Sequence, residues 1–433
     1  MAEWLCRGLQ ILVCRFDSDP GLHNKKTPTW VFFFCCLVGI EPARFAYEQR
    51  FTSDVCLIVN TLAGVFFILY YPRMIESITL TDFRNHTACR VTTHGRRNVI
   101  ITGPNGAGKT AILEAVSMLS GDRGLRGAPM TDVARFNGAG GFSVFAHLAD
   151  ETEVSVTYTG GDTNRRARID GDAAPLSDLS GLLRVVWLTP REDRLFVDSA
   201  SERRAFFDRL AASFDAAHAG RTARLSKLMS ERAYALKSGA DTHWLDAIDA
   251  QISGTAVAVS AARIQYAGEL NYFLSRCAVS CSGVLEQMLI SGVSAGDAER
   301  RYMDYLRQNR TLINDKMVLD GPHKSDFGVF NNDLNLPANL TSTGQQKTVL
   351  LDLVLAHAKL VHAKTGGHCL ILLDEAAAHL DKNAREKLFC DLADTNAQVW
   401  ATGLDASVFE NVPNAVFVAC HDGEINNILT SEK

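Results

Sequence analysis

The sequence lacks a strong excess of positive charge. It carries 44 Lys and Arg residues against 49 Asp and Glu in 433 residues, a formal net charge of −5. This balance excludes a protein that attracts nucleic acid over its whole surface, so a nucleic-acid partner would require a local basic patch. With 47% apolar and 21% charged residues, the chain has the composition of a globular protein of two or three lobes.

Regularly spaced cysteine pairs are also missing. The 11 cysteines include no C-x-x-C pair, and five of them fall within the first 73 residues. This spacing gives no indication of a zinc site or a redox pair. It favours reduced thiols in a cytoplasmic protein.

Two uncharged apolar runs precede residue 74, at 27–40 and 55–72. The first is too short to span a bilayer and the second is at the lower limit, and neither resembles a secretory signal. Three interpretations stay open for residues 1–73: a non-native extension read from a misplaced start, a membrane anchor, or a packed accessory hairpin. The first is favoured, so a membrane partner is not expected. An alternating, strand-like pattern typical of the start of a domain begins at Met74.

The rest of the chain predicts an α/β fold in which two segments build one mixed sheet. Residues 74–81 and 98–102 are predicted strands, residues 109–119 a helix, residues 140–159 antiparallel strands and residues 185–188 a further strand. Residues 366–374 form an apolar run without alternation, typical of a central parallel strand. We expect a head made of residues 74–200 and 317–433, with residues 201–316 as an inserted α-helical lobe.

The sequence G-P-N-G-A-G-K-T predicts a phosphate-binding loop between a strand and a helix. Its glycines let the backbone wrap closely, so that N–H groups and the helix N-terminus meet phosphate oxygens. Lys109 supplies a charge for the β- and γ-phosphates of ATP, and the Thr110 hydroxyl is placed to bind Mg²⁺. A plain glycine-rich turn would leave both side chains unexplained. The predicted nucleotide-binding residues are Gly103, Pro104, Asn105, Gly106, Ala107, Gly108, Lys109 and Thr110.

Two carboxylates end the apolar strand in I-L-L-D-E. Ligands bind at the carboxyl ends of strands in open α/β sheets. We therefore expect Asp374 to hold Mg²⁺, and Glu375 to orient and deprotonate the attacking water. Glu375 and Lys109 are the predicted catalytic residues. The alternative is a strand that simply ends in an acidic turn. It is disfavoured because a phosphate loop lies upstream in the same chain.

The sequence S-T-G-Q-Q starts at Ser342, directly before an amphipathic helix. Ser342 can serve as the N-cap, and the start of the helix then presents its positive dipole to an anion. Because the chain's own phosphate loop is already occupied, that anion would be the γ-phosphate of a partner subunit. An ordinary capped helix explains Ser342 but leaves Gly344 and the pair Gln345 and Gln346 unexplained. Ser342, Gly344 and Gln345 are thus expected to bind nucleotide.

This motif resembles the signature sequence of ABC-type ATPases, which build their working site from two copies. The resemblance implies a homodimer that forms on ATP binding. It also implies that Asp381, in H-L-D, communicates across the dimer, and that Thr402, in A-T-G, occupies the switch position.

The flanking sequence narrows the resemblance to the RecF family, over residues 74–429. The family-like stretches are L-T-D-F-R-N-H, the phosphate loop, L-T-P-R-E-D-R-L-F with S-E-R-R-A-F-F-D, D-G-P-H-K-S-D-F, S-T-G-Q-Q-K, and L-L-D-E with H-L-D. The resemblance implies weak DNA-dependent ATP hydrolysis, DNA binding near single-strand gaps and double-strand to single-strand junctions, and a RecR-like mediator partner. It places the protein in recombinase loading, in DNA replication and repair, and in the SOS response to DNA damage.

Short arginine clusters are the candidates for DNA contacts, although solvated arginine pairs are commoner. They comprise Arg96, Arg97, Arg165, Arg166, Arg168, Arg203 and Arg204. His323 and Lys324 are either near a partner surface or in a capped turn.

Three other functions share some of these features. A transporter ATPase places its signature much closer to the phosphate loop than the roughly 230 residues between Lys109 and Ser342. Another SMC-like ATPase of the coiled-coil type needs long heptad arms. A DNA scaffold that binds nucleotide without turnover would be favoured if Glu375 were dispensable.

Overall fold

The computed structural model divides the chain into two compact units, residues 1–72 and residues 73–433. The structure describes residues 50–52, 55–60, 65–70, 73–310, 319–365, 369–375, 380, 382–395, 397–421 and 423–428. In the first unit, the described residues form an antiparallel sheet in the order β1-β2-β3, made of Arg50–Thr52, Val55–Asn60 and Val65–Tyr70. The described residues of the second apolar run therefore form strands β2 and β3, while the first run lies outside the described residues. No helix in the described ranges has both the length and the apolar character needed to cross a membrane.

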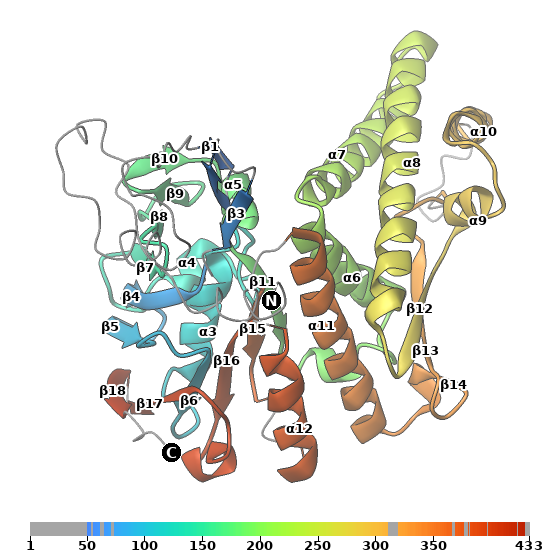
Figure 1. Cartoon of the computed structure of the whole chain (residues 1–433). Helices are drawn as coiled ribbons and strands as arrows, with labels where there is room; N and C mark the ends of the chain where they lie inside the picture. Colours follow the sequence, from blue (N-terminus) through green and yellow to red (C-terminus); the bar gives the residue numbers. More distant parts are fainter. Residues whose placement is uncertain are drawn as a thin grey trace. The chain divides into compact units, whose positions relative to one another are not determined.

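The second unit is built on a six-stranded sheet in the order β11-β15-β16-β6-β17-β18 (Figure 1). Neighbouring strands run parallel except for the antiparallel pair β17 and β18. Strands β6, β15 and β16 are buried at every position, as expected for parallel strands covered on both faces. The strands span Arg184–Leu188, Cys369–Leu373, Gln398–Gly403, Asn98–Thr102, Ala415–His421 and Glu424–Ile428.

A second six-stranded sheet is antiparallel, with the order β10-β9-β8-β7-β4-β5. Strand β7 alternates strictly between buried and half-buried residues, which is the period of a strand with one face on the core. Helix α3 (Lys109–Met118) contributes to the core shared with this sheet. The strands span Asp172–Ala174, Arg166–Ile169, Glu153–Tyr158, Phe142–Leu148, Ile75–Phe83 and His86–Thr92.

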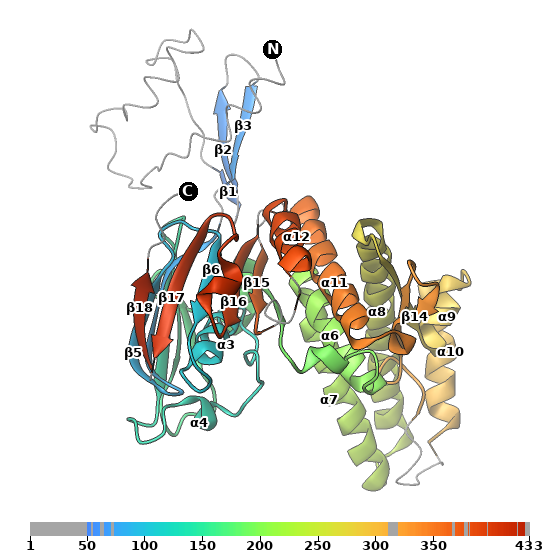
Figure 2. The same ribbon diagram turned by 90° about the horizontal axis from the view of Figure 1, so that it is seen from below.

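Most of the remaining residues of the unit form helices, and in Figure 2 α7 lies alongside α8. The N-terminus of α8 is capped by Asp241, whose side chain accepts the backbone N–H of Trp244 at 2.7 Å, a standard way of satisfying a free helical N–H. The helices are α6 (Ala200–Phe214), α7 (Ala217–Lys237), α8 (Thr242–Phe273), α9 (Val284–Ile290), α10 (Ala295–Gln308), α11 (Thr343–Thr365) and α12 (Lys382–Ala393).

One strand lies where the sequence analysis expected helix. Strand β12 (Cys277–Ser282) falls inside the stretch 201–316 and pairs antiparallel with β13 (Asp326–Asn331), which continues to β14 (Leu336–Pro337). The helical expectation is wrong there. Cys277, Val279 and Cys281 alternate with less buried residues, and β13, which is distant in sequence, supplies the hydrogen bonds of this strand. Helix α11 contacts both β15 and α8, so head and helical lobe share this helix within one unit.

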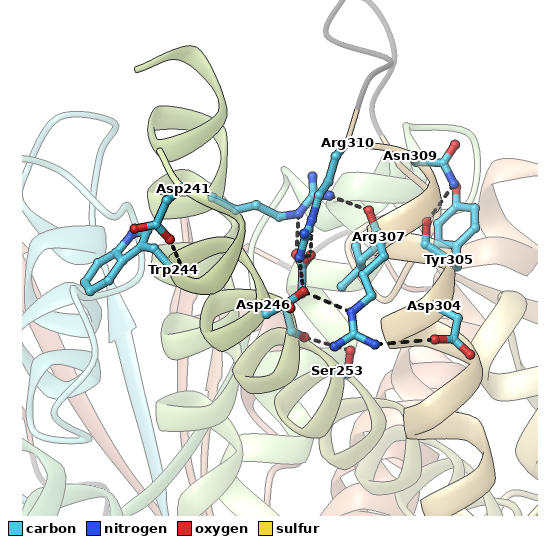
Figure 3. A network of polar contacts seen from close by, with 12 residues as sticks. Asp241, Trp244, Asp246, Ser253, Asp304, Tyr305, Arg307, Asn309 and Arg310 are labelled. Atoms are coloured by element: carbon cyan, nitrogen blue, oxygen red, sulfur yellow. Dashed lines mark hydrogen bonds and ion pairs between the residues drawn. The ribbon is translucent and has the colours of Figure 1, made fainter. Parts of the chain in front are cut away.

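An ion-pair network fastens α7, α8 and the end of α10 together. The fully buried Asp249 accepts hydrogen bonds from Arg232 Nε at 2.6 Å and Arg310 Nε at 2.9 Å. Asp246 accepts from Arg307 Nε at 3.0 Å and Arg310 Nη2 at 2.7 Å (Figure 3). Since a buried carboxylate is costly unless it is paired, these arginines fix how the three helices pack.

Candidate functional site

The phosphate loop connects β6 to α3 and needs glycine at two positions. Gly103 has a φ of 150°, and a Cβ there would collide with the carbonyl oxygen of Cys420. Gly108 has a φ of 109°, and a Cβ there would collide with the imidazole of His86. The loop is therefore confined between the end of β17 and the start of β5.

Lys109 lies over the loop it belongs to. Its buried ammonium group donates hydrogen bonds to the carbonyl oxygens of Gly103 at 2.7 Å and Pro104 at 2.9 Å. This places the positive charge at the concave side of the loop, where phosphate oxygens would meet the loop N–H groups.

Thr110 and Asp374 meet although 264 positions separate them in sequence. The Thr110 hydroxyl lies 3.0 Å from both carboxylate oxygens of Asp374, which directly follows β15. Burial raises the pKa of Asp374, against the opposing effect of hydrogen bonds from Thr402 and Thr110. A buried carboxylate beside a hydroxyl offers the hard oxygen ligands that Mg²⁺ prefers.

Glu375 adopts a left-handed backbone conformation with a φ of 54°. Its backbone N–H donates to Thr402 Oγ1 at 2.9 Å, and the same hydroxyl donates to Asp374 Oδ1 at 2.8 Å. Such a conformation costs about 1–3 kcal/mol in a residue other than glycine and marks functional sites. Thr402, at the end of β16, thus determines the positions of both acidic residues.

Lys109, Thr110 and Glu375 line one pocket of about 580 Å³, a volume typical of small-molecule sites. Sequence reasoning missed about half of its wall, which the turn after β4 and residues 126–136 supply. In the sequence, the only indication of this part of the pocket is F-R-N-H, which resembles the RecF family but was not predicted to be a site. The lining residues are Arg84, Asn85, Asn105, Gly106, Gly108, Lys109, Thr110, Ala111, Arg126, Asp132, Ala134, Arg135, Phe136 and Glu375.

Arg84 joins this turn to α3. Its guanidinium makes a bidentate pair with Glu114, with Nε to Oε2 at 2.8 Å and Nη2 to Oε1 at 2.6 Å, and Glu114 is fully buried. The neighbouring His86 is also buried, with its ring nitrogens 2.8 Å and 3.2 Å from the carbonyl oxygens of Gly423 and Gly108. The turn therefore supports the phosphate loop from outside.

The segment 342–346 contributes no side chain to this pocket among the residues described. Ser342 and Gln345 form a capping box: Gln345 N–H donates to Ser342 Oγ at 3.4 Å, and Ser342 N–H donates to Gln345 Oε1 at 2.9 Å. Gln346 Nε2 donates to the Thr341 carbonyl at 2.9 Å. The capped helix therefore does explain both glutamines, contrary to our expectation.

Gly344 is the residue of this motif that the chain's own structure leaves unexplained. It is exposed, and a Cβ added to it would have no neighbour within 4 Å. Asp381, the other residue expected at a subunit contact, lies outside the described residues.

Several candidate DNA-contact residues are engaged inside the protein. Arg203 makes a bidentate pair with Asp326 at 2.8 and 2.7 Å, and Arg165 is buried with Nη2 donating to the Gly121 carbonyl at 2.6 Å. Arg204 donates to the Ser325 carbonyl at 2.7 Å. These contacts favour a structural role for the three.

The remaining candidates lie nearer the surface. Arg166 and Arg168 are exposed, whereas Arg96 and Arg97 are half-buried. Lys324 pairs with Asp320 at 3.1 Å, four residues earlier in the same turn. His323 Nε2 lies 2.6 Å from the Leu319 carbonyl oxygen. The capped turn therefore accounts for the last two.

Fold and pocket together define a class. A phosphate loop between a buried parallel strand and a helix, with two carboxylates two strands away, is the head of an ABC-type ATPase, here with an inserted helical lobe.

Comparison with known proteins narrows this class. A family model described as RecF/RecN/SMC N terminal domain matches residues 74–427. The DNA replication and repair protein RecF of Mesorhizobium japonicum is 39% identical over 355 residues, covering 78% of this chain and 93% of that protein. The protein of the same name from Rhizobium etli is 37% identical over 367 residues, covering 81% and 98%. The chain belongs to the RecF family of DNA replication and repair proteins.

A solved structure shares the fold. The structure described as recombination mediator protein RecF-ATPrS in the RecFOR pathway has a TM-score of 0.72 and 21% sequence identity, and the match covers 83% of this chain and 99% of that one. At this identity the likeness concerns the fold alone.

Proposed function

We propose that the chain binds and slowly hydrolyses ATP, and that ATP binding drives formation of a homodimer on DNA at single-strand gaps and junctions. A RecR-like mediator protein would join it there to load recombinase, in the cytoplasm. The observation that carries the proposal is the contact of Thr110 with Asp374 at 3.0 Å. It unites the phosphate loop with the acidic strand end in one pocket.

The phosphate loop, Lys109 and Glu375 have distinct roles in this proposal. Loop residues 103–108 offer backbone N–H groups to the phosphates, and Lys109 exchanges its loop carbonyl partners for phosphate oxygens. Glu375 accepts the proton of the attacking water. The backbone N–H of Glu375 donates to Thr402, and the residue has a left-handed backbone conformation. Together these features fix the direction in which the Glu375 side chain leaves the backbone.

Thr110 and Asp374 would hold Mg²⁺. Burial raises the pKa of Asp374, and a bound cation would favour its charged form. When bound, the ion would neutralise charge on the β- and γ-phosphates. The donor set is hydroxyl and carboxylate oxygen, which suits Mg²⁺.

The dimer is supported by the exposed N-terminus of α11. Ser342, Gly344 and Gln345 lie outside the chain's own nucleotide pocket, and the helix start offers N–H groups and a positive dipole. In the proposed dimer they meet the γ-phosphate bound by the partner subunit, and Asp381 lies near the contact. An exposed glycine lets a phosphate approach the backbone closely.

The DNA partner rests on the family. Relatives are named DNA replication and repair proteins, and one solved structure with this fold is described as part of the RecFOR pathway. The net charge of −5 requires that the DNA surface be local.

The test compares the full chain with its Glu375→Gln variant, by light scattering with and without ATP and by binding to gapped duplex DNA. We expect ATP-dependent dimers in both, and dimers that persist in the variant because water is no longer deprotonated. Lys109→Ala is the control that should abolish dimers. A wild-type chain that stays monomeric when ATP is added and has no affinity for gapped DNA would contradict the proposal.

A further inference from the structure

Phe136 is the most exposed large apolar side chain in the described part of the molecule, at 87% of its full accessible area. It also lines the nucleotide pocket. An aromatic ring left in water loses the favourable burial that a core position would give it. A ring kept in that state at the wall of a ligand pocket is placed to be covered by the ligand.

The backbone around Phe136 is held in place. Ala134 forms a β-bridge with Phe83, the last residue of β4. Next along the chain, Arg135 N–H donates to the Asp82 carbonyl at 2.8 Å, and Arg135 Nε pairs with the Asp82 carboxylate at 2.6 Å. The exposure of the ring is therefore built into the fold, since two adjacent residues fasten the segment to β4.

The chemistry of the pocket divides it into two parts. Lys109, Thr110 and Glu375 supply the cation, the metal ligand and the base that act on the terminal phosphates. The turn after β4 and the segment 132–136 contribute other lining residues outside α3 and the phosphate loop, and Phe136 is the one aromatic side chain among the described lining residues. A nucleoside triphosphate that places its phosphates on the loop must extend its base away from Glu375.

We propose that Phe136 is the platform on which the purine base of the bound nucleotide stacks. The inference rests on the proposed function, because it requires the triphosphate to occupy the loop. Stacking on an aromatic ring uses the π-face that every base has, and it needs no hydrogen bond to the base edge. Phe136 would add affinity for the nucleoside part of ATP and none for its phosphates.

The test measures the affinity of the full chain for Mg-ATP and for Mg-tripolyphosphate by calorimetry. Phe136→Ala should weaken ATP binding about tenfold, in the range of base–aromatic stacking, and leave tripolyphosphate binding unchanged. Phe136→Trp should keep ATP affinity, and ATP but not tripolyphosphate should quench the added indole fluorescence. The control is Tyr272→Ala, an aromatic residue of α8 that is 83% exposed and lies outside the pocket lining; it should change neither affinity.

The outcomes separate this inference from the function on which it rests. Unchanged ATP affinity in Phe136→Ala overturns the stacking role, and if dimer formation is lost at the same time the ring belongs to a subunit contact. An equal loss for both ligands also overturns it, since the ring would then be supporting the phosphate loop. A wild-type chain that binds neither ligand overturns the proposed function and the stacking role together.

Discussion

The hydroxyl of Thr402 lies 2.8 Å from Asp374 Oδ1 and donates its proton to that oxygen. The same hydroxyl accepts the backbone N–H of Glu375 at 2.9 Å. One side chain at the end of β16 therefore sets the position of two acidic residues that follow β15. The position is fully buried, so water cannot replace the missing hydroxyl without rearrangement.

Replacing Thr402 by valine, which has the same shape without the hydroxyl, should lower the rate of ATP hydrolysis. Loss of a hydrogen bond of about 1 kcal/mol from the reacting arrangement corresponds to roughly a fivefold effect. ATP affinity should change little, because the loop and Lys109 are untouched. Steady-state hydrolysis and calorimetric binding measure the two effects. Thr402→Ser keeps the hydroxyl and should restore the rate; equal rates in all three proteins would show that Thr402 has no positioning role.

Gly344 is predicted to be needed for the contact between two subunits and not for the stability of one subunit. A methyl group at this position meets nothing in its own chain, so Gly344→Ala should leave the melting temperature unchanged or slightly raised, since alanine favours helix. ATP-dependent dimers should nevertheless be lost, because the methyl group would occupy the space of the partner's phosphate. Light scattering and a thermal melt separate the two effects.

The matched control for Gly344 is Gly268→Ala. Gly268 is an exposed glycine within α8 that also has open space around it. The Gly268→Ala variant should still form dimers when ATP is added. Dimers of normal stability in Gly344→Ala would remove the argument for a subunit contact at the start of α11.

Local patterns predicted the head of this protein well, because each pattern specifies its own geometry. Residues 98–102 and 109–119 were predicted as the strand and helix around the phosphate loop, and β6 and α3 occupy them. The contact between Thr110 and Asp374 follows from sheet topology, since β15 and β6 lie parallel with β16 between them. The spacing S-x-x-Q is also the pattern of a capping box, which Ser342 and Gln345 form.

Features that depend on distant pairing could not be predicted in this way. Strand β12 is a strand because β13, about 45 residues later, supplies its hydrogen bonds. Phe136 follows no helical or strand period, and its place in the pocket depends on the bridge between Ala134 and Phe83. The charge of Arg203 suggested DNA, whereas its partner Asp326 is 123 positions away.

Arg203 is predicted to stabilise the fold. Its bidentate pair with Asp326 and its bonds to the carbonyl oxygens of Phe196 and Asp198 join α6 to β13 and to the segment before α6. Arg203→Met should lower the free energy of unfolding by about 1.5–3 kcal/mol, the usual contribution of a hydrogen bond to a charged group. Urea titration measures the change.

Arg166→Met is the comparison for Arg203. Arg166 is exposed and pairs with Asp162 at 3.1 Å, and exposed ion pairs contribute at most about 1 kcal/mol. This variant should therefore unfold almost as the wild type does. If Arg203→Met had normal stability and bound DNA more weakly, Arg203 would instead be a DNA-contact residue.

His357 should make the protein less stable in mild acid. Its ring lies between Ser213 Oγ at 2.7 Å and Tyr266 Oη at 3.0 Å, and burial lowers the pKa of His357 from 6.5 to about 3. The unfolded chain takes up a proton as the pH falls through 6.5, whereas the folded chain stays neutral until about pH 3. The unfolded state therefore binds more protons between these values, and stability is lost as the pH falls.

From pH 7 to pH 5.5 this one group should cost about 1 kcal/mol of unfolding free energy. His357→Gln, which keeps a donor and an acceptor for the two hydroxyls but does not titrate, should be less stable at pH 7 and lose correspondingly less on acidification. Urea unfolding of both proteins at the two pH values gives the difference directly. Equal losses of unfolding free energy in the two proteins would mean that the acid sensitivity arises from other groups. His357 would then be accommodated in its charged form by a rearrangement of α6, α8 and α11.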